Sequence, residues 1–177
     1  MFAMEAYDEP WKANYNDYPS WGLWDSSGNL KPGMATVFEG GGTSTEGGCD
    51  PSSPIGGAGT PTITFTSVPV IGSTNNLTGQ VAHVASASDN VFVVIYVDGN
   101  WWLKPYADSP LTPINCDGTW SADIVTGGDD TQATVIDAFV IPLSYSPPGT
   151  GDGLVGPTLP QDLFQNAAAY TSVTRAP

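Results

Sequence analysis

Positive charge is the scarcest property of this sequence. Its 177 residues hold only 4 lysines and arginines against 18 aspartates and glutamates, which gives a formal net charge of -14 at pH 7. A protein that binds nucleic acid or an anionic membrane surface needs basic side chains to neutralise phosphates. We therefore expect no nucleic-acid partner and no membrane partner, whereas a neutral polymer is compatible with this charge.

Histidine and cysteine are almost as rare. His83 is the single histidine, so an ordinary zinc or copper site and a Ser-His-Asp triad both lack the residues they need, and we expect no metal site of that kind. The two cysteines, Cys49 and Cys116, lie far apart in the sequence. They either form a disulfide in an oxidising compartment or stay as two thiols, because sequence gives no geometry.

No long apolar run is present either. A membrane-spanning helix needs about 20 consecutive apolar residues, and no stretch approaches that length. The first residues lack the pattern of a charged region followed by an apolar one, so no signal peptide is expected in this chain.

Glycine and proline are abundant in this sequence, whereas charged residues are few. The chain has 21 glycines and 16 prolines, and only 12% of its residues are charged. This composition indicates short strands separated by many turns, with few helices. We predict strands over 62–68, 76–84, 90–97, 100–104, 119–125, 134–142 and 170–175, and one helical turn near 161–165.

The number and spacing of these strands predict an all-β fold, a two-sheet sandwich of the immunoglobulin or fibronectin size class. Residues 91–105, VFVVIYVDGNWWLKP, are expected to be its central hairpin, with a tight turn at 98–100. Adjacent strand residues point to opposite faces, so Trp101 and Trp102 are expected on opposite sides of the sheet. The predicted core residues are Ile63, Phe65, Leu77, Val81, Val93, Ile95, Trp120, Ile124, Ile136, Phe139 and Val173.

Two segments precede the sandwich, which is expected over 62–177. Residues 40–61, GGGTSTEGGCDPSSPIGGAGTP, have the composition of a flexible linker. Residues 1–39 differ in composition from the rest of the chain and are too short to bury a core by themselves. The aromatic residues within 1–34 would form a sizeable apolar patch if left bare, so we expect this segment to dock on the sandwich or to drive self-association.

The N-terminal segment resembles glycoside hydrolase family 17, which acts on β-1,3-glucans and related polymers. FAMEAYDEPWK and the following WGLWDSSGNLKP are similar to the last strand and final helix of the (β/α)8 barrel of that family. Glu9 and Lys12 match the paired Glu and Lys that line the family's substrate cleft. The resemblance implies an upstream barrel in a longer enzyme, or a truncated reading frame.

The two catalytic glutamates of that family lie on earlier barrel strands, which this sequence does not contain. Retaining hydrolysis needs two carboxylates about 5 to 5.5 Å apart across one glycosidic bond. A last strand alone cannot supply them, so family 17 catalysis is not expected of this chain.

Most of residues 62–175 resembles a β-sandwich module that follows catalytic domains in bacterial secreted proteins. The motifs that carry this resemblance are NLTGQV at 76–81, the strand at 91–97, GNWWLKP at 99–105, DGTW at 117–120 and TGGDDTQAT at 126–134. The two resemblances together imply an extracellular location. Likeness at the level of the fold implies an architecture and does not carry a function with it.

The hairpin and the DGTW turn hold the best candidates for a binding surface. Sugar rings have flat apolar faces that stack on tryptophan and tyrosine, while neighbouring polar side chains bind the hydroxyls. A strand tryptophan in a sandwich is nevertheless more often core than site. The candidate ligand-binding residues are Asp98, Trp101, Trp102, Lys104, Tyr106 and Trp120.

The acidic residues leave two further interpretations open. The turn at 127–130, with Asp117 and Asp123 nearby in sequence, has the oxygen-rich chemistry of a structural calcium site, although without EF-hand spacing. A small glycan-hydrolysing enzyme would use carboxylates without a recognisable paired spacing, such as Asp98, Asp108, Asp117, Asp123 and Asp129.

The leading hypothesis is a noncatalytic carbohydrate-binding module of a secreted β-glucan-active enzyme, with β-glucan as its partner and no cofactor. One alternative is a small glycan hydrolase in its own right. The other is a structural sandwich that packs against the barrel or mediates association without binding sugar.

Overall fold

The computed structural model describes residues 49–175, and every structural statement below concerns these residues. The segment 1–39 that resembles the end of a barrel lies outside them, together with Glu9 and Lys12. The surface within 1–34 that is expected to dock or self-associate lies outside them as well.

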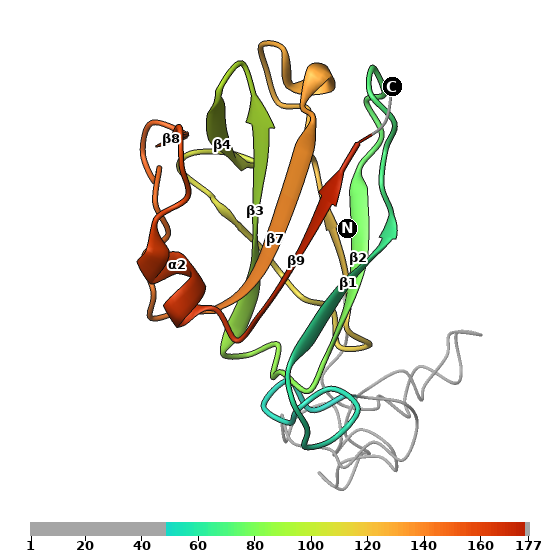
Figure 1. The fold of residues 1–177 in the computed structure, drawn as a ribbon. Helices are drawn as coiled ribbons and strands as arrows, with labels where there is room; N and C mark the ends of the chain where they lie inside the picture. Colours follow the sequence, from blue (N-terminus) through green and yellow to red (C-terminus); the bar gives the residue numbers. More distant parts are fainter. Residues whose placement is uncertain (1–48, 176–177) are drawn as a thin grey trace, which may run out of the picture. The chain divides into compact units, whose positions relative to one another are not determined.

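Nine strands and one short α-helix make up the described part of the chain (Figure 1). All seven predicted strands are present, with ends that differ by at most three residues, and the predicted helical turn is α2. The two short strands β5 and β8 are additions that the sequence does not predict. The bounds are β1 Thr62–Ser67, β2 Leu77–Ala82, β3 Asp89–Val97, β4 Asn100–Lys104, β5 Leu111–Thr112, β6 Thr119–Ala122, β7 Val135–Pro142, β8 Leu154–Gly156 and β9 Ala169–Thr174, with the 3-10 helix η2 Asp130–Gln132 and the helix α2 Gln161–Asn166.

The strands pair in an antiparallel manner in two sheets. The smaller sheet has the order β1-β2-β6, and the larger sheet has the order β8-β4-β3-β7-β9, with β5 paired to the start of β3. The predicted all-β sandwich is confirmed, whereas its assignment to the immunoglobulin or fibronectin type stays a prediction. Within residues 49–175, no helix is long and apolar enough to cross a membrane.

The main core lies between the two sheets. Leu77 and Val81 of β2 meet Val93 and Ile95 of β3 there, and all four side chains are almost fully buried. Every predicted core residue belongs to this core or packs against it, with the exception of Phe139. The alternation of inward and outward residues therefore predicted the inner faces correctly.

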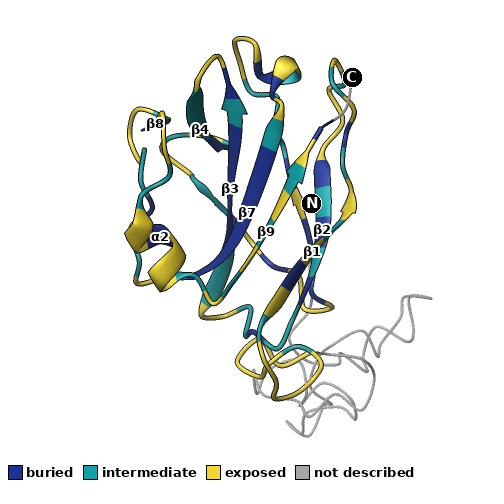
Figure 2. Cartoon of the chain, in the orientation of Figure 1, coloured by how far each residue is buried: buried dark blue, intermediate teal, exposed yellow. Residues whose placement is uncertain are grey.

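The two central strands, β3 and β7, are buried on both faces (Figure 2). Phe92 and Val94 of β3 and Phe139 of β7 point to the outer face of the larger sheet, where Leu163 of α2 packs on them. A strand that is covered on both sides favours apolar residues on both of its faces. This preference explains why residues 91–97 form a continuous apolar run.

A two-residue turn at Asp98 and Gly99 joins β3 to β4. Both residues have positive φ, 52° and 79° respectively, and Val97 pairs with Asn100 on either side of the turn. Two positive φ angles are the requirement of a type I′ turn, for which Asp-Gly is a preferred sequence. The turn thereby sets the register in which Trp102 lies opposite Ile95 and Lys104 opposite Val93.

Trp120 of β6 is a core residue. It is only 1% exposed and lies against Gly79 of β2, where an added Cβ would fall 2.2 Å from the indole ring. The absence of a side chain at Gly79 makes the space that the indole occupies. The expectation that Trp120 is a core residue is therefore confirmed, whereas its place among the candidate ligand-binding residues is wrong.

Residues 49–61 belong to the sandwich. The backbone N–H of Ile55 donates to Val84 at 2.9 Å, and the N–H of His83 donates to Ile55 at 2.7 Å. Ile55 also packs against the main core. The compact unit that contains the sandwich begins at Cys49, so residues 49–61 of the predicted linker pack with the sandwich, and residues 40–48 of it lie outside the described residues. Glycine and proline here build turns that backbone hydrogen bonds hold in place.

Cys49 and Cys116 form a disulfide. Their Cα atoms lie 5.6 Å apart, within the usual range for disulfides. The bond ties the start of the sandwich unit to the loop that precedes β6, and it spans a sequence separation of 67 residues.

Replacing both cysteines with alanine is expected to lower the free energy of unfolding by about 4 kcal/mol, because the loop would no longer be closed in the unfolded chain. Denaturant unfolding of oxidised wild type and of the C49A/C116A variant measures this difference. Reduced wild type is the matched control and should unfold with the double variant. Equal midpoints for the oxidised protein and the double variant would contradict the expectation.

Candidate functional site

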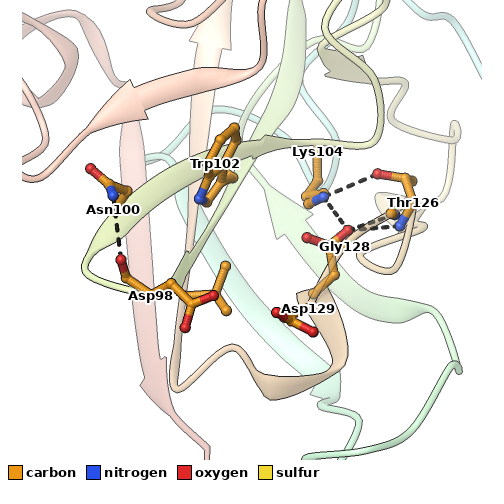
Figure 3. A pocket seen from close by; sticks show the side chains of 10 residues that line it. Asp98, Asn100, Trp102, Lys104, Thr126, Gly128 and Asp129 are labelled. Carbon is orange, nitrogen blue, oxygen red and sulfur yellow. Dashed lines mark hydrogen bonds and ion pairs between the residues drawn. The ribbon is translucent and has the colours of Figure 1, made fainter.

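A pocket of about 390 Å³ opens between the β3–β4 hairpin and the loop that leads from β6 to β7 (Figure 3). This volume falls in the range of small-molecule sites, roughly 300 to 1,000 Å³. The hairpin contributes Val97, Asp98, Asn100, Trp102 and Lys104, and the loop contributes residues 126–130.

Trp102 forms a wall of the pocket and Trp101 does not. Trp102 is half-buried and packs against the main core, whereas Trp101 packs with the outer-face cluster. The ring of Trp101 lies 5.2 Å from that of Tyr96, measured between centroids. The predicted opposite orientation of the two indoles is thus confirmed, and the inclusion of Trp101 in one ligand surface with Trp102 is wrong.

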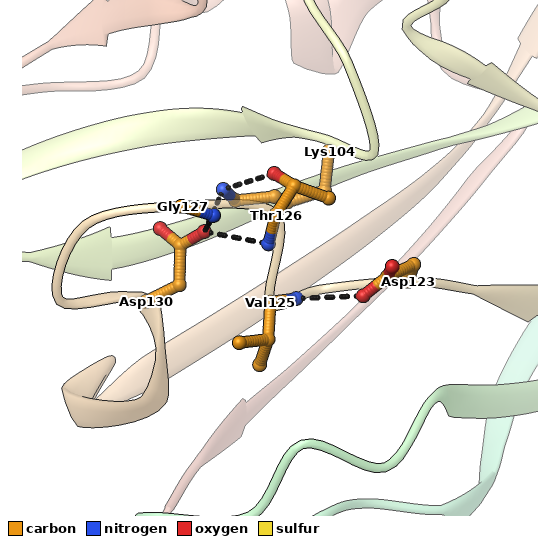
Figure 4. A network of polar contacts seen from close by, with 6 residues as sticks. All are labelled: Lys104, Asp123, Val125, Thr126, Gly127 and Asp130. Carbon is orange, nitrogen blue, oxygen red and sulfur yellow. Dashed lines mark hydrogen bonds and ion pairs between the residues drawn. The ribbon is translucent and has the colours of Figure 1, made fainter.

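The base of the pocket holds a buried ion pair. The ammonium of Lys104 lies 2.5 Å from Oδ2 of Asp130, and it also donates to the hydroxyl of Thr126 at 3.0 Å (Figure 4). Lys104 and Asp130 are each only 5% exposed. Burial of a charge is costly unless an opposite charge and hydrogen bonds compensate for it, and both are present here.

The carboxylate of Asp130 also shapes the loop. Its Oδ2 accepts the backbone N–H groups of Thr126 and Gly127, each at 2.9 Å. Farther along, the guanidinium of Arg175 donates to the carbonyl of Ala133 at 3.0 Å and to that of Pro69 at 2.8 Å. The pocket loop is therefore fixed at both ends by buried charged side chains.

The mouth of the pocket is acidic. Asp98 and Asp129 are exposed on its opposite sides, and Asn100 of the hairpin lies between Asp98 and Trp102 along the chain. Lys104, the only cation among the lining residues, is neutralised by Asp130. Two carboxylates thus remain without a paired cation in the lining, and the resulting field disfavours anionic ligands.

The structure brings together three of the six predicted ligand-binding residues, namely Asp98, Trp102 and Lys104. Tyr106 is 54% exposed, but it does not line the pocket. Trp101 faces the other side of the sheet and Trp120 is core. The stacking surface therefore shrinks from four aromatic side chains to one.

The carboxylates considered for catalysis or for calcium do not converge as a group. Asp117 accepts hydrogen bonds from the side chain and backbone of Thr119, which hold its pKa below the usual value. Asp123 accepts the backbone N–H of Val125 at 2.9 Å. Among residues 49–175, no group of three or more His, Cys, Asp or Glu side chains is placed to hold a metal ion.

Sequence reasoning missed the partner of Lys104. The sequence marks the acidic turn 127–130 as a candidate calcium loop and the hairpin as a candidate sugar platform, without connecting the two. A signal is present in the strand period, which places Lys104 on the inner face with Trp102 and so requires a counter-ion. Asn100 and Thr126 carry no such signal.

Outside the pocket, Asp137 of β7 is a buried carboxyl on the outer face of the larger sheet. It is 7% exposed, and its Oδ1 has no hydrogen-bond partner among the described residues. Burial raises the pKa of Asp137 above its ordinary value of 3.8, because the charged form loses hydration, and a hydrogen bond from Ser172 opposes the shift in part.

Comparison with known proteins finds a short similarity. Over 49 residues the chain is 49% identical to proteins named glucan endo-1,3-beta-glucosidase btgC in Aspergillus niger and Aspergillus fumigatus. The aligned stretch covers 25% of this chain and only 7% of each of these relatives. It agrees with a relation to glucan-active glycoside hydrolases, and the resemblance to a bacterial accessory module stays a prediction.

No family model matches the chain, and no solved structure matches it.

Replacing Lys104 with methionine is expected to destabilise the fold by about 3 to 5 kcal/mol, because Asp130 would be left as an uncompensated buried charge. Urea unfolding measures the loss. The control is Lys104→Met combined with Asp130→Asn, which removes both charges and keeps an acceptor for the loop, and should recover most of the stability. A single variant as stable as wild type would contradict the buried pair.

Asp137 should make stability depend on pH. A carboxyl whose pKa is raised on folding contributes stability that is full below the unfolded pKa and is lost as pH rises through the folded pKa. Wild type should therefore lose stability relative to Asp137→Asn as the pH increases from 3 through the folded pKa. Unfolding curves across this range measure the difference, with exposed Asp108→Asn as control. A pH-independent difference would rule out the raised pKa.

Proposed function

We propose that this chain is a noncatalytic carbohydrate-binding module of a secreted, β-glucan-active enzyme, and that it binds glucan in the pocket beside Trp102. One observation carries the proposal: a half-buried indole forms the wall of a pocket that also holds carboxylate, amide and ammonium groups. A sugar ring offers an apolar C–H face to the indole and hydroxyls to the polar groups. Ligand pockets combine these two elements, an apolar wall and a few polar groups that fix orientation.

The choice of glucan is supported by the short similarity to proteins named glucan endo-1,3-beta-glucosidase. The charge supports it too, since the acidic mouth and the net charge of -14 favour a neutral polymer over an anionic one. A disulfide is typical of proteins in oxidising compartments and supports an extracellular location. An upstream hydrolase barrel is the partner that this function implies.

Binding without hydrolysis is favoured by the way the pocket carboxylates are used. Oδ2 of Asp130 already accepts three donors, and this carboxylate is paired with the ammonium of Lys104, which leaves only Oδ1 for a ligand. Asp98 and Asp129 are the remaining pair that a hydrolase would use. Release of reducing ends from glucan by the purified chain would favour that alternative.

Native electrophoresis in gels that contain β-1,3-glucan tests the site. Wild type should be retarded, and Trp102→Ala should migrate as it does in a gel without glucan, because the stacking wall is gone. Trp101→Ala is the matched control, since it removes the same side chain from the opposite face of the same strand and should remain retarded.

Thermal unfolding of both variants shows whether each still folds, and Trp102→Phe provides a smaller change at the same place with partial retardation expected. Equal retardation of wild type and a folded Trp102→Ala would contradict the proposed site. If the wild type is not retarded by any β-glucan, the proposed function itself fails.

A further inference from the structure

The base of the pocket carries an unused donor beside an unused acceptor. The Lys104 ammonium has three N–H donors, of which the described residues take two, through Asp130 and the hydroxyl of Thr126. Oδ2 of Asp130 accepts three hydrogen bonds, whereas Oδ1 has no hydrogen bond to any described residue and is drawn without a contact in Figure 4. Both side chains line the pocket.

These two groups are held in place before any ligand arrives. Each residue is about nineteen-twentieths buried, and their direct contact fixes the position of the third N–H relative to the second carboxylate oxygen. A charged donor and a charged acceptor in such a place form strong, oriented hydrogen bonds with a ligand. This pair fits a neutral ligand that has two neighbouring polar groups, one that accepts a hydrogen bond from Lys104 and one that donates a hydrogen bond to Asp130.

We propose, on the basis of the function proposed above, that Lys104 and Asp130 recognise two adjacent free hydroxyls of a single pyranose ring. One hydroxyl accepts a hydrogen bond from Lys104, and its neighbour donates one to Oδ1 of Asp130, while the ring packs against Trp102. Both hydroxyls belong to neighbouring ring carbons, so they match a donor and an acceptor that are in contact with each other.

This pairing specifies which part of a β-1,3-glucan enters the pocket. Each internal residue of that polymer has its oxygen at carbon 3 in a linkage, which leaves hydroxyls at carbons 2, 4 and 6, and no two of these carbons are adjacent. The non-reducing terminal residue keeps hydroxyls at carbons 2, 3 and 4. The reducing terminal residue also has an adjacent pair, at carbons 1 and 2, but its hydroxyl at carbon 1 interconverts between two anomers, whereas the two pairs of the non-reducing end have a fixed configuration. We therefore assign the pocket to the non-reducing chain end, and the interior of the chain lacks the group that the pocket recognises.

The size of the pocket agrees with recognition of a chain end. Its volume of about 390 Å³ lies near the lower limit of ligand sites and suits one ring rather than a long segment of polymer. The exposed carboxylates of Asp98 and Asp129 at the mouth then contact the second ring of the glucan.

Periodate oxidation provides a direct test, because it cleaves carbon–carbon bonds only between adjacent free hydroxyls. In the methyl β-glycoside of a linear β-1,3-linked glucotetraose, only the non-reducing terminal ring is opened, and the other three rings stay intact. Titration calorimetry of the full chain compares this oligosaccharide before and after oxidation and borohydride reduction.

Binding of the untreated oligosaccharide should weaken by at least about tenfold after oxidation, the loss expected for one charge-assisted hydrogen bond or more. Equal binding before and after oxidation would overturn the chain-end proposal and leave the glucan-binding function standing. Absence of binding to both forms would overturn the two proposals together.

A variant pair tests the same groups from the protein side. The double variant Lys104→Met with Asp130→Asn removes the charged donor and acceptor, keeps an acceptor for the loop, and should bind the untreated oligosaccharide at least about tenfold more weakly. Trp101→Ala, on the opposite face, should bind as wild type does. A folded double variant with wild-type affinity would overturn the assignment of these two residues.

Discussion

The register of one hairpin determines what the pocket contains. The turn at Asp98 and Gly99 fixes how β4 pairs with β3, and the pleat then sends Trp102 and Lys104 to the inner side of the sheet and Trp101 to the outer side. A slip of one residue would exchange the two faces of β4. It would send Trp102 and Lys104 to the outer side, which would separate Lys104 from Asp130, and would place Trp101 on the inner side in a different register. The positive φ angles that Asp98 and Gly99 adopt are therefore a condition for the site as well as for the fold.

The buried Lys104–Asp130 pair has a role that its stability contribution does not explain. Buried ion pairs are often no more stabilising than well-packed apolar residues of similar volume. This pair nevertheless joins the edge of the hairpin to a loop 26 residues further along, and it leaves an N–H and a carboxylate oxygen without partners among the described residues. The pair stands where apolar side chains could pack, and it gives the pocket polar groups that apolar residues would not supply. A ligand that supplies both missing hydrogen bonds completes it.

Much of the fold could be predicted from the sequence, because strands with a buried face have a period of two and because Asp-Gly marks a hairpin turn. The run 91–97, the turn at 98–99 and the inward residues of β2 followed from these local rules. The choice between the two roles expected for Trp120, core residue or ligand-binding residue, could not be made from local rules, since a DGTW motif has the same residues whether its indole packs on a glycine of the next strand or faces solvent. Gly79 decides this, and their pairing depends on β2 and β6 being neighbours.

The site was only half predictable for a similar reason. Trp102, Lys104 and Asp98 belong to one local element, so the strand pattern grouped them. Asp130 and Thr126 come from a different loop, which composition described only as an acidic turn. The same limit affected residues 49–61, whose glycines and prolines suggested a linker. The two backbone hydrogen bonds between Ile55 and the segment at 83–84 depend on contacts that composition does not reveal.

The most direct test of the central claim, that the pocket beside Trp102 is the glucan site, is a titration of the isotopically labelled chain with a β-1,3-linked gluco-oligosaccharide, followed by NMR. We predict that the indole N–H of Trp102 and the amides of Asn100, Gly127 and Gly128 shift, while the indole of Trp101 does not. Shifts confined to Trp101, Tyr96 and the outer face of the larger sheet, or no shifts at saturating ligand, would contradict the account.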